Sequence, residues 1–268
     1  MDYNLFKYEF HKLSGIDLNY YKEKQMKRRI ESQIKRSGFE SYSDFLAALR
    51  KKDSLYEAFL SYITINVTEF YRNPGQWDTF EKEILPMVLQ RSSTPKIWSC
   101  ACSTGEEPYT IAMILAKYLT PDKIKILASD IDDAAIAKAK EAKYSFKSVE
   151  SLPNEFKSKY FRHSEDDKFE LKCLIKRCVE FRHLDLLKDD YPMDCDIIVC
   201  RNVLIYFTET AKDMIYKRFN KSLKPNGILY LGNTEQIIKP DKYKLKSLKT
   251  FYYTKDEELP EKPEEELQ

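Results

Sequence analysis

Five polar side chains come soon after short apolar runs in this chain, at spacings that could build one binding site. Acidic groups at the start of a helix repel phosphate and suit an ammonium group or sugar hydroxyls. An acidic residue at the end of a second strand, 25 residues after the turn glycine Gly105, is placed to bind the two hydroxyls of a ribose. The five residues are Glu106, Glu107, Asp130, Asp185 and Asn202.

The first of these runs leads into a strand, a turn and a helix. Residues 96–100 are apolar and predict a buried strand, and Ser103-Thr104-Gly105 favours a turn. Pro108 suits the first turn of a helix, whose free backbone N–H groups would face a ligand. With acidic residues beside those N–H groups, the pattern favours a ligand such as S-adenosylmethionine over ATP or NAD.

Strands and helices alternate through the second part of the chain, which predicts an open, doubly wound α/β sheet. Ligands bind such sheets at the carboxyl ends of the strands, where the five polar residues would gather. An antiparallel edge strand is predicted within 243–253, and the alternation in 169–176 predicts an inserted antiparallel subdomain at about 160–180. The predicted buried strands are 96–100, 125–129, 179–182, 196–200 and 227–231, and the predicted helices between them include 132–142 and 209–222.

The first 64 residues have the pattern of a helical bundle, with Ser43 as the expected N-cap of its third helix. Residues 65–78 mix polar with β-branched and aromatic residues and predict a linker into a main domain over 79–254. The acidic tail 255–268 is expected to be disordered. The helices predicted in the first part of the chain are 3–13, 19–35, 43–50 and 54–64, and a further helix over 77–90 enters the main domain.

Composition argues against several function classes. The net charge is only +2, which gives no argument for nucleic acid. No apolar run approaches the ~18–20 residues of a membrane span, and the first residues lack the pattern of a signal peptide; we expect a cytoplasmic protein without membrane insertion. Six cysteines form no CxxC pair and there are three histidines, so no metal site is expected. The absence of GxxxxGK[ST] disfavours nucleotide triphosphate hydrolysis.

Four segments together resemble the chemotaxis receptor methyltransferase (CheR) family, whose members methylate glutamates of bacterial chemoreceptors with S-adenosylmethionine. The resemblance extends over residues 1–253 and implies a methyltransferase fold behind a helical receptor-docking domain. The segments are TINVTEFYRN (64–73), WSCACSTGEEPYTIAM (98–113), ASDID (128–132) and CRNVLIYF (200–207).

The resemblance also implies which residues meet S-adenosyl-L-methionine and its product S-adenosyl-L-homocysteine. Some relatives have Asn-Leu-Leu where this chain has Asp185-Leu186-Leu187, and Glu106 is left open between a helix-start charge and a cofactor contact. The implied cofactor-binding residues are Asn66, Thr68, Arg72, Glu107, Asp130, Asp185, Leu186, Asn202 and Val203.

Methyl transfer to a glutamate needs no general base, because a carboxylate is already ionised at neutral pH, with a reference pKa of about 4.3. Catalysis would then come from aligning oxygen, methyl and sulfur and from removing water. Arg72 could hold the substrate carboxylate through charge-assisted hydrogen bonds. Tyr206 is the second catalytic candidate, as a positioning hydroxyl.

The helix predicted over 19–35 is markedly basic, and such a face is either a solvated surface or a docking site for an acidic partner. The resemblance favours docking of the receptor's glutamate-bearing helices. Tethering relatives bind a receptor's C-terminal peptide through a Gly-rich loop, but SEDDKFELKC (164–173) has no glycine, so we expect no such tether, and a monomer. The predicted docking residues are Lys24, Lys27, Arg28, Arg29 and Lys35.

Two other functions stay open at this point. One is an S-adenosylmethionine-dependent methyltransferase with another substrate, although the [DN]PP[FYW] signature of amino-methylating enzymes is absent. The other is a non-catalytic protein that senses the cofactor and docks receptors, against which the presence of both Arg72 and Tyr206 argues.

Overall fold

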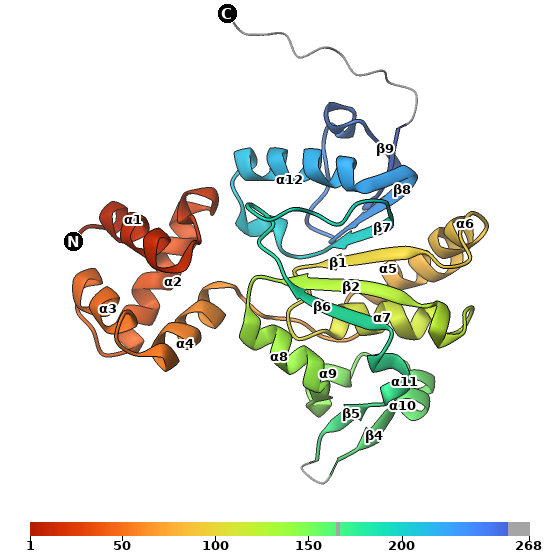
Figure 1. The fold of residues 1–268 in the computed structure, drawn as a ribbon, viewed down its shortest axis with the longest axis horizontal. Helices are drawn as coiled ribbons and strands as arrows, with labels where there is room; N and C mark the ends of the chain where they lie inside the picture. The colour runs from red at the N-terminus through yellow and green to blue at the C-terminus, as the bar shows by residue number, and fades with distance from the viewer. Residues whose placement is uncertain (165–166, 257–268) are drawn as a thin grey trace, which may run out of the picture.

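The computed structural model describes residues 1–164 and 167–256, and its first 64 residues fold into a helical module (Figure 1). Phe6, Phe10, Phe45 and Phe59 are fully buried at its centre, where three of their ring pairs stack or meet edge to face. The helices are α1 (Tyr3–Ser14), the 3₁₀ turn η1 (Leu18–Tyr20), α2 (Glu23–Arg36), α3 (Tyr42–Leu49) and α4 (Asp53–Ile63).

Two local predictions for this module were wrong. The helix predicted over 19–35 is instead a 3₁₀ turn and a separate α2, because Tyr21 between them is extended, at φ −101° and ψ 151°. The N-cap of α3 is Ser41 rather than Ser43. The Ser41 Oγ accepts the backbone N–H of Asp44 at 3.1 Å, whereas Ser43 lies inside the first turn.

The main domain is built on a seven-stranded sheet with the order β6-β2-β1-β7-β8-β10-β9, which confirms the predicted α/β class. The first five strands in that order are parallel, and β10 runs antiparallel to β8. The single edge strand predicted within 243–253 is two antiparallel strands, β9 and β10. The strands are β1 (Lys96–Cys100), β2 (Lys125–Asp130), β6 (Val179–His183), β7 (Cys195–Cys200), β8 (Leu223–Leu231), β9 (Leu245–Lys249) and β10 (Tyr252–Lys255).

Helices cover both faces of this sheet and bury two apolar clusters (Figure 1). Neighbouring residues of β1 point to opposite faces: Ile97 joins the cluster with α7, and Trp98 joins the one with α12. The helix predicted over 77–90 is observed as a continuous helical run that already begins at Pro74, inside the predicted linker. The helices are α5 (Pro74–Thr79), the π-helical η2 (Phe80–Ile84), α6 (Leu85–Leu89), α7 (Glu106–Leu115), α8 (Asp133–Glu141) and α12 (Glu209–Ser222), with 3₁₀ turns η3 (Pro121–Lys123), η4 (Leu204–Tyr206) and η5 (Pro240–Tyr243).

A small antiparallel sheet of order β3-β5-β4 is inserted between β2 and β6. The alternating run 169–176 was predicted to be strand throughout, but only its first three residues are, and the rest forms a helical turn. The elements are β3 (Lys143–Tyr144), α9 (Phe146–Val149), α10 (Asn154–Tyr160), β4 (Phe161–His163), β5 (Phe169–Leu171) and α11 (Cys173–Lys176).

Two of the sequence-based expectations, the disordered tail and the segment without a tether, concern residues that the structure describes only in part. Of the predicted tail, Lys255 belongs to β10, and residues 257–268 lie outside the described residues, as do 165–166 of the segment expected to lack a tether. Within residues 1–164 and 167–256, no helix combines the length and apolar character needed to cross a membrane.

The capping geometry of α3 predicts different effects for two neighbouring serines. Ser41→Ala removes an N-cap and should lower the free energy of unfolding by about 1 kcal/mol, whereas Ser43→Ala, within the helix, should change it by less than about 0.5 kcal/mol. Urea denaturation followed by circular dichroism measures both. Equal losses in the two variants would contradict the observed cap.

Candidate functional site

A cavity lies between the N-terminal module and the carboxyl ends of β1, β2, β6 and β7. The space between its walls, with the solvent at its open mouth included, is about 1020 Å³. On its wall lie all ten residues that the family resemblance implied for cofactor binding or that were candidates for catalysis: Asn66, Thr68, Arg72, Glu107, Asp130, Asp185, Leu186, Asn202, Val203 and Tyr206.

Asp130 ends β2 and is almost fully buried, with 5% of its surface exposed. Its carboxylate accepts the backbone N–H of Ser103 at 2.7 Å and that of Asp132 at 3.0 Å. Burial raises the pKa of Asp130 to about 6, against the lowering effect of these N–H donors. Two of its roughly four acceptor positions are thus used, so it can accept further hydrogen bonds from a ligand's hydroxyls.

Asp185 stands beyond the end of β6 on another part of the wall. Its carboxylate accepts the N–H of Leu187 at 2.8 Å, and burial raises its pKa. The neighbouring Leu186 is buried and gives this side of the cavity an apolar surface. A polar group beside an apolar wall suits a flat heterocycle with hydrogen-bonding edges.

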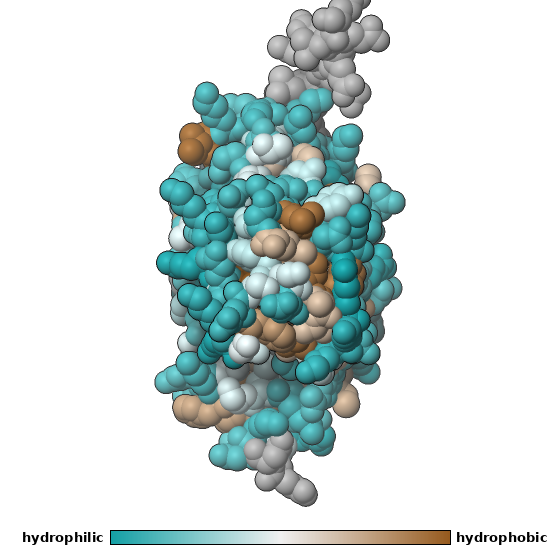
Figure 2. Space-filling model, turned by 90° about the vertical axis from the view of Figure 1, so that its left-hand side faces the viewer, coloured by the Kyte–Doolittle hydropathy of each residue, from teal (hydrophilic) through white to brown (hydrophobic). Residues whose placement is uncertain are grey.

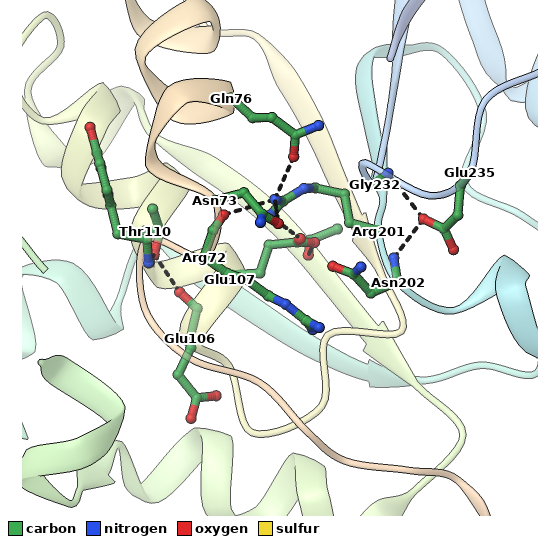
Figure 3. Close-up of polar contacts among 12 residues, drawn as sticks. Arg72, Asn73, Gln76, Glu106, Glu107, Thr110, Arg201, Asn202, Gly232 and Glu235 are labelled. Atoms are coloured by element: carbon green, nitrogen blue, oxygen red, sulfur yellow. Dashed lines mark hydrogen bonds and ion pairs between the residues drawn. The ribbon is translucent and has the colours of Figure 1, made fainter. Parts of the chain in front are cut away.

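The two glutamates at the start of α7 have different surroundings. Glu107 lines the cavity, accepts the Ser99 hydroxyl at 2.9 Å and pairs with Arg201 at 3.3 Å. Burial raises its pKa, and Arg201 opposes that effect. Glu106 is not part of the cavity wall; its carboxylate accepts the Thr104 hydroxyl at 2.7 Å, and Figure 3 shows it pointing away from Arg201. Burial raises the pKa of Glu106 to about 7.

Arg201 joins the end of β7 to the linker (Figure 3). One of its terminal nitrogens donates to the backbone carbonyl of Arg72 at 2.8 Å, the side chain of Asn73 at 3.3 Å and the side chain of Gln76 at 2.8 Å. The guanidinium also lies over the rings of Trp77 and Tyr230, at 4.8 and 5.0 Å from their centroids. Sequence reasoning gave Arg201 no role, although a charge directly after an apolar strand was the available signal.

The linker crosses the cavity in a bent conformation. Asn66 donates to Asp132 at 2.6 Å and its side-chain oxygen accepts the Ser103 hydroxyl at 3.2 Å, so the linker is bonded to the loops after β1 and β2. The Arg72 guanidinium donates to the Val67 carbonyl at 3.1 Å. Ile65 has φ +57°, and Tyr71 and Asn73 also have positive φ, a conformation that costs a non-glycine residue of order 1–3 kcal/mol.

Glu235 is a second residue that sequence reasoning missed. It lies in the loop after β8, 5% exposed, and its carboxylate accepts backbone N–H groups of Asn202, Leu204, Ile205 and Gly232. It is not part of the cavity wall but supports the loop that is. A lone glutamate 33 residues from its first partner leaves no periodic pattern to detect.

The N-terminal module is bonded directly to the loop that carries Tyr206. The Lys22 N–H donates to the Tyr206 carbonyl at 2.8 Å, and the Thr208 N–H donates to the Tyr20 carbonyl at 2.8 Å. Between these bonds Tyr21 pairs with Phe207, their ring centroids 4.9 Å apart. Tyr21 therefore becomes part of the cavity wall, a contribution that the sequence did not predict.

Comparison with known proteins decides the family. Residues 66–252 match the model described as CheR methyltransferase, SAM binding domain, and residues 1–64 match the CheR methyltransferase, all-alpha domain. The chain belongs to the CheR methyltransferase family. The chemotaxis protein methyltransferase of Listeria monocytogenes is 40% identical over 242 residues, 90% of this chain and 92% of that protein. That of Borreliella burgdorferi is 34% identical over 236 residues, 83% of each.

The cofactor expected from the sequence, S-adenosylmethionine, is confirmed by this family domain, and the chemistry of the cavity fits it. Carboxylates suit an ammonium group and ribose hydroxyls, and the apolar wall around Leu186 suits an adenine. Glu107 occupies the start of α7 facing the cavity, where its carboxylate would repel a phosphate group.

The raised pKa of Asp130 predicts a pH dependence of cofactor binding. In its predicted role the ionised carboxylate accepts ribose hydroxyls, so protonation as the pH falls through about 6 should weaken binding. We expect the Kd for S-adenosylhomocysteine, measured by calorimetry, to rise roughly tenfold from about pH 8 to about pH 5.

Two variants serve as controls for this prediction. Asp130→Asn should bind more weakly at high pH and with a flatter pH profile. Glu106→Gln removes a carboxyl of similarly raised pKa that points away from the cavity, and should keep the profile of the unmodified protein. An unchanged profile in Asp130→Asn would show that another group carries the pH dependence.

Proposed function

We propose that this protein transfers the methyl group of S-adenosylmethionine to glutamate side chains of chemoreceptor cytoplasmic domains, forming methyl esters. The observation that carries the proposal is that Arg72 and Tyr206 line the same cavity as the acidic residues suited to the cofactor. The names of the relatives, chemotaxis protein methyltransferases, support the choice of acceptor. A cytoplasmic protein acting as a monomer, without nucleic acid, accords with this role.

S-adenosylmethionine would supply a methyl group activated by a positively charged sulfur. The acceptor carboxylate arrives ionised, so this chain has to orient it and exclude water rather than remove a proton. Arg72 would hold one carboxylate oxygen, and its hydrogen bond to the Val67 carbonyl keeps its guanidinium at the linker. The Tyr206 hydroxyl would help to position the methyl group that is transferred. We assign cofactor contacts to Asn66, Thr68, Asn202 and Val203 in the same proposal.

The acidic substrate would dock on α2. Lys24, Arg28 and Lys35 are exposed and lie on one face of this helix, while Lys27 is half-buried beside Glu31. Arg29 differs from the rest of the predicted docking set: it donates to the Tyr62 carbonyl and stacks on the Tyr62 ring at 4.5 Å, which ties α2 to α4.

The end of the molecule formed by the N-terminal helices is largely hydrophilic around a smaller apolar centre, as Figure 2 shows. The apolar centre suits the apolar face of an amphipathic helix, and the exposed cations Lys24, Arg28 and Lys35 suit its glutamates. Because the segment 164–173 contains no glycine, we retain the expectation that no receptor-tail peptide is tethered there.

Methyl-labelled cofactor tests the function directly. Incubated with this protein and a receptor cytoplasmic domain, it should leave base-labile label on receptor glutamates, because methyl esters hydrolyse in base. Label on a different acceptor would indicate a methyltransferase with another substrate. Tight cofactor binding without any label would indicate a sensor.

Charge reversal on α2 tests the docking surface. Lys24→Glu, Arg28→Glu and Lys35→Glu combined should lower kcat/KM for the receptor roughly tenfold or more, because the substrate's glutamates would be repelled. The Kd for S-adenosylhomocysteine should stay unchanged. A matched variant, Lys51→Glu, Lys123→Glu and Lys125→Glu, makes the same change in net charge at exposed positions off α2. Equal losses in both triple variants would argue against docking on α2.

A further inference from the structure

Glu235 is a buried carboxylate that does not face the cavity yet holds part of its wall. It is 5% exposed and follows β8 in the turn Gly232-Asn233-Thr234-Glu235. One oxygen accepts the N–H of Asn202 at 2.6 Å and that of Gly232 at 3.0 Å. The other accepts those of Leu204 at 2.6 Å and Ile205 at 3.3 Å. Figure 3 shows it on the opposite side of Asn202 from Arg201 and Glu107.

This arrangement requires a carboxylate. Four backbone N–H donors converge on one side chain, and only an ionised carboxyl group has two oxygens that can accept all of them. An amide would turn an NH₂ group toward two of the donors. Gly232 is part of the same fit, because a Cβ there would lie 2.5 Å from a Glu235 oxygen and 2.9 Å from the Asn202 nitrogen.

The loop that Glu235 holds carries four residues of the cavity wall, Asn202, Val203, Tyr206 and Phe207. Asn202 is in the left-handed conformation, at φ +61°, and η4 follows it directly. The N–H groups of Leu204 and Ile205, at the start of η4, have no intrahelical acceptor, and Glu235 supplies one. The positions of the side chains that face the cavity thus depend on Glu235, which holds the loop from its other side.

We propose that Glu235 is a positioning residue for methyl transfer, which acts through the backbone of residues 202–205 to hold Tyr206 at the reacting groups. This inference rests on the proposed function for its kinetic consequence. Glu235 itself does not line the cavity. Its effect on the rate passes through Tyr206. If the loop shifts, Tyr206 shifts with it, and a small displacement of a catalytic group is enough to slow a reaction strongly.

Two substitutions separate acceptor chemistry from packing. Glu235→Gln keeps the shape and loses acceptor capacity, whereas Glu235→Asp keeps the carboxylate and shortens the side chain. For positioning through hydrogen bonds, Asp should retain more activity than Gln, and Gln should lower kcat roughly 10- to 100-fold. If Gln is the better tolerated variant, packing explains the residue and the proposal fails.

A double-mutant cycle with Tyr206→Phe tests the route of the effect. If Glu235 acts through Tyr206, Glu235→Gln should lower kcat much less in the Tyr206→Phe background than in the unmodified protein. Losses that multiply in the double variant would overturn the proposal. Glu106→Gln, which also removes a buried carboxylate near the site, should leave kcat within about twofold of the unmodified protein.

Hydrogen exchange provides a readout that does not need methylation. Glu235→Gln should speed amide exchange in residues 202–206, and Glu106→Gln should not. Unchanged exchange in that segment would also overturn the proposal, and it can be measured for Glu235→Asp if the Gln variant fails to fold. Absence of receptor methylation by the unmodified protein would refute the proposed function instead, while the exchange result would still test the anchor.

Discussion

The guanidinium of Arg201 is a positive charge held out of water, and the surrounding protein has to replace the water it lost. Glu107 supplies the opposite charge, the linker supplies three oxygen acceptors, and two aromatic rings cover its faces. Removing one partner of such a buried pair costs about 3–5 kcal/mol, because the remaining charge stays uncompensated. These contacts therefore hold the linker against the end of β7. The linker residues that line the cavity keep their positions only while these contacts are present.

The parts of the molecule that the sequence predicted are those with a local signal. Parallel strands end on one edge of a sheet, so Asp130, Asp185 and Asn202 could be brought together from apolar runs alone. Arg201 and Glu235 could not, because their partners are 129 and 33 residues away and no periodicity marks such pairs. The start of α2 was predicted wrongly for a related reason. The extended Tyr21 is held by pairing with Phe207 rather than by its own neighbours in sequence.

Backbone strain gathers around the same cavity. Ile65, Ala101, Ser103 and Asn202 all line it with positive φ, although none is a glycine. Each such residue costs of order 1–3 kcal/mol and persists where surrounding contacts over-determine it. The hydrogen bonds of Ser103 to Asp130 and of Asn202 to Glu235 are contacts of that kind. The carboxylates that border or support the cavity thus also hold its backbone in conformations that the chain alone would avoid.

The backbone hydrogen bonds from Lys22 to Tyr206 and from Thr208 to Tyr20 fix the N-terminal module to the loop that carries Tyr206. Because α2 begins at Glu23, one residue after Lys22, a substrate helix docked on α2 would lie at a distance from Tyr206 that is set when the chain folds. In the proposed reaction, the fixed distance between α2 and Tyr206 then decides which glutamate reacts. A glutamate would be chosen by its place along the docked helix, at about 1.5 Å per residue, and the side chains beside it would need no pocket of their own.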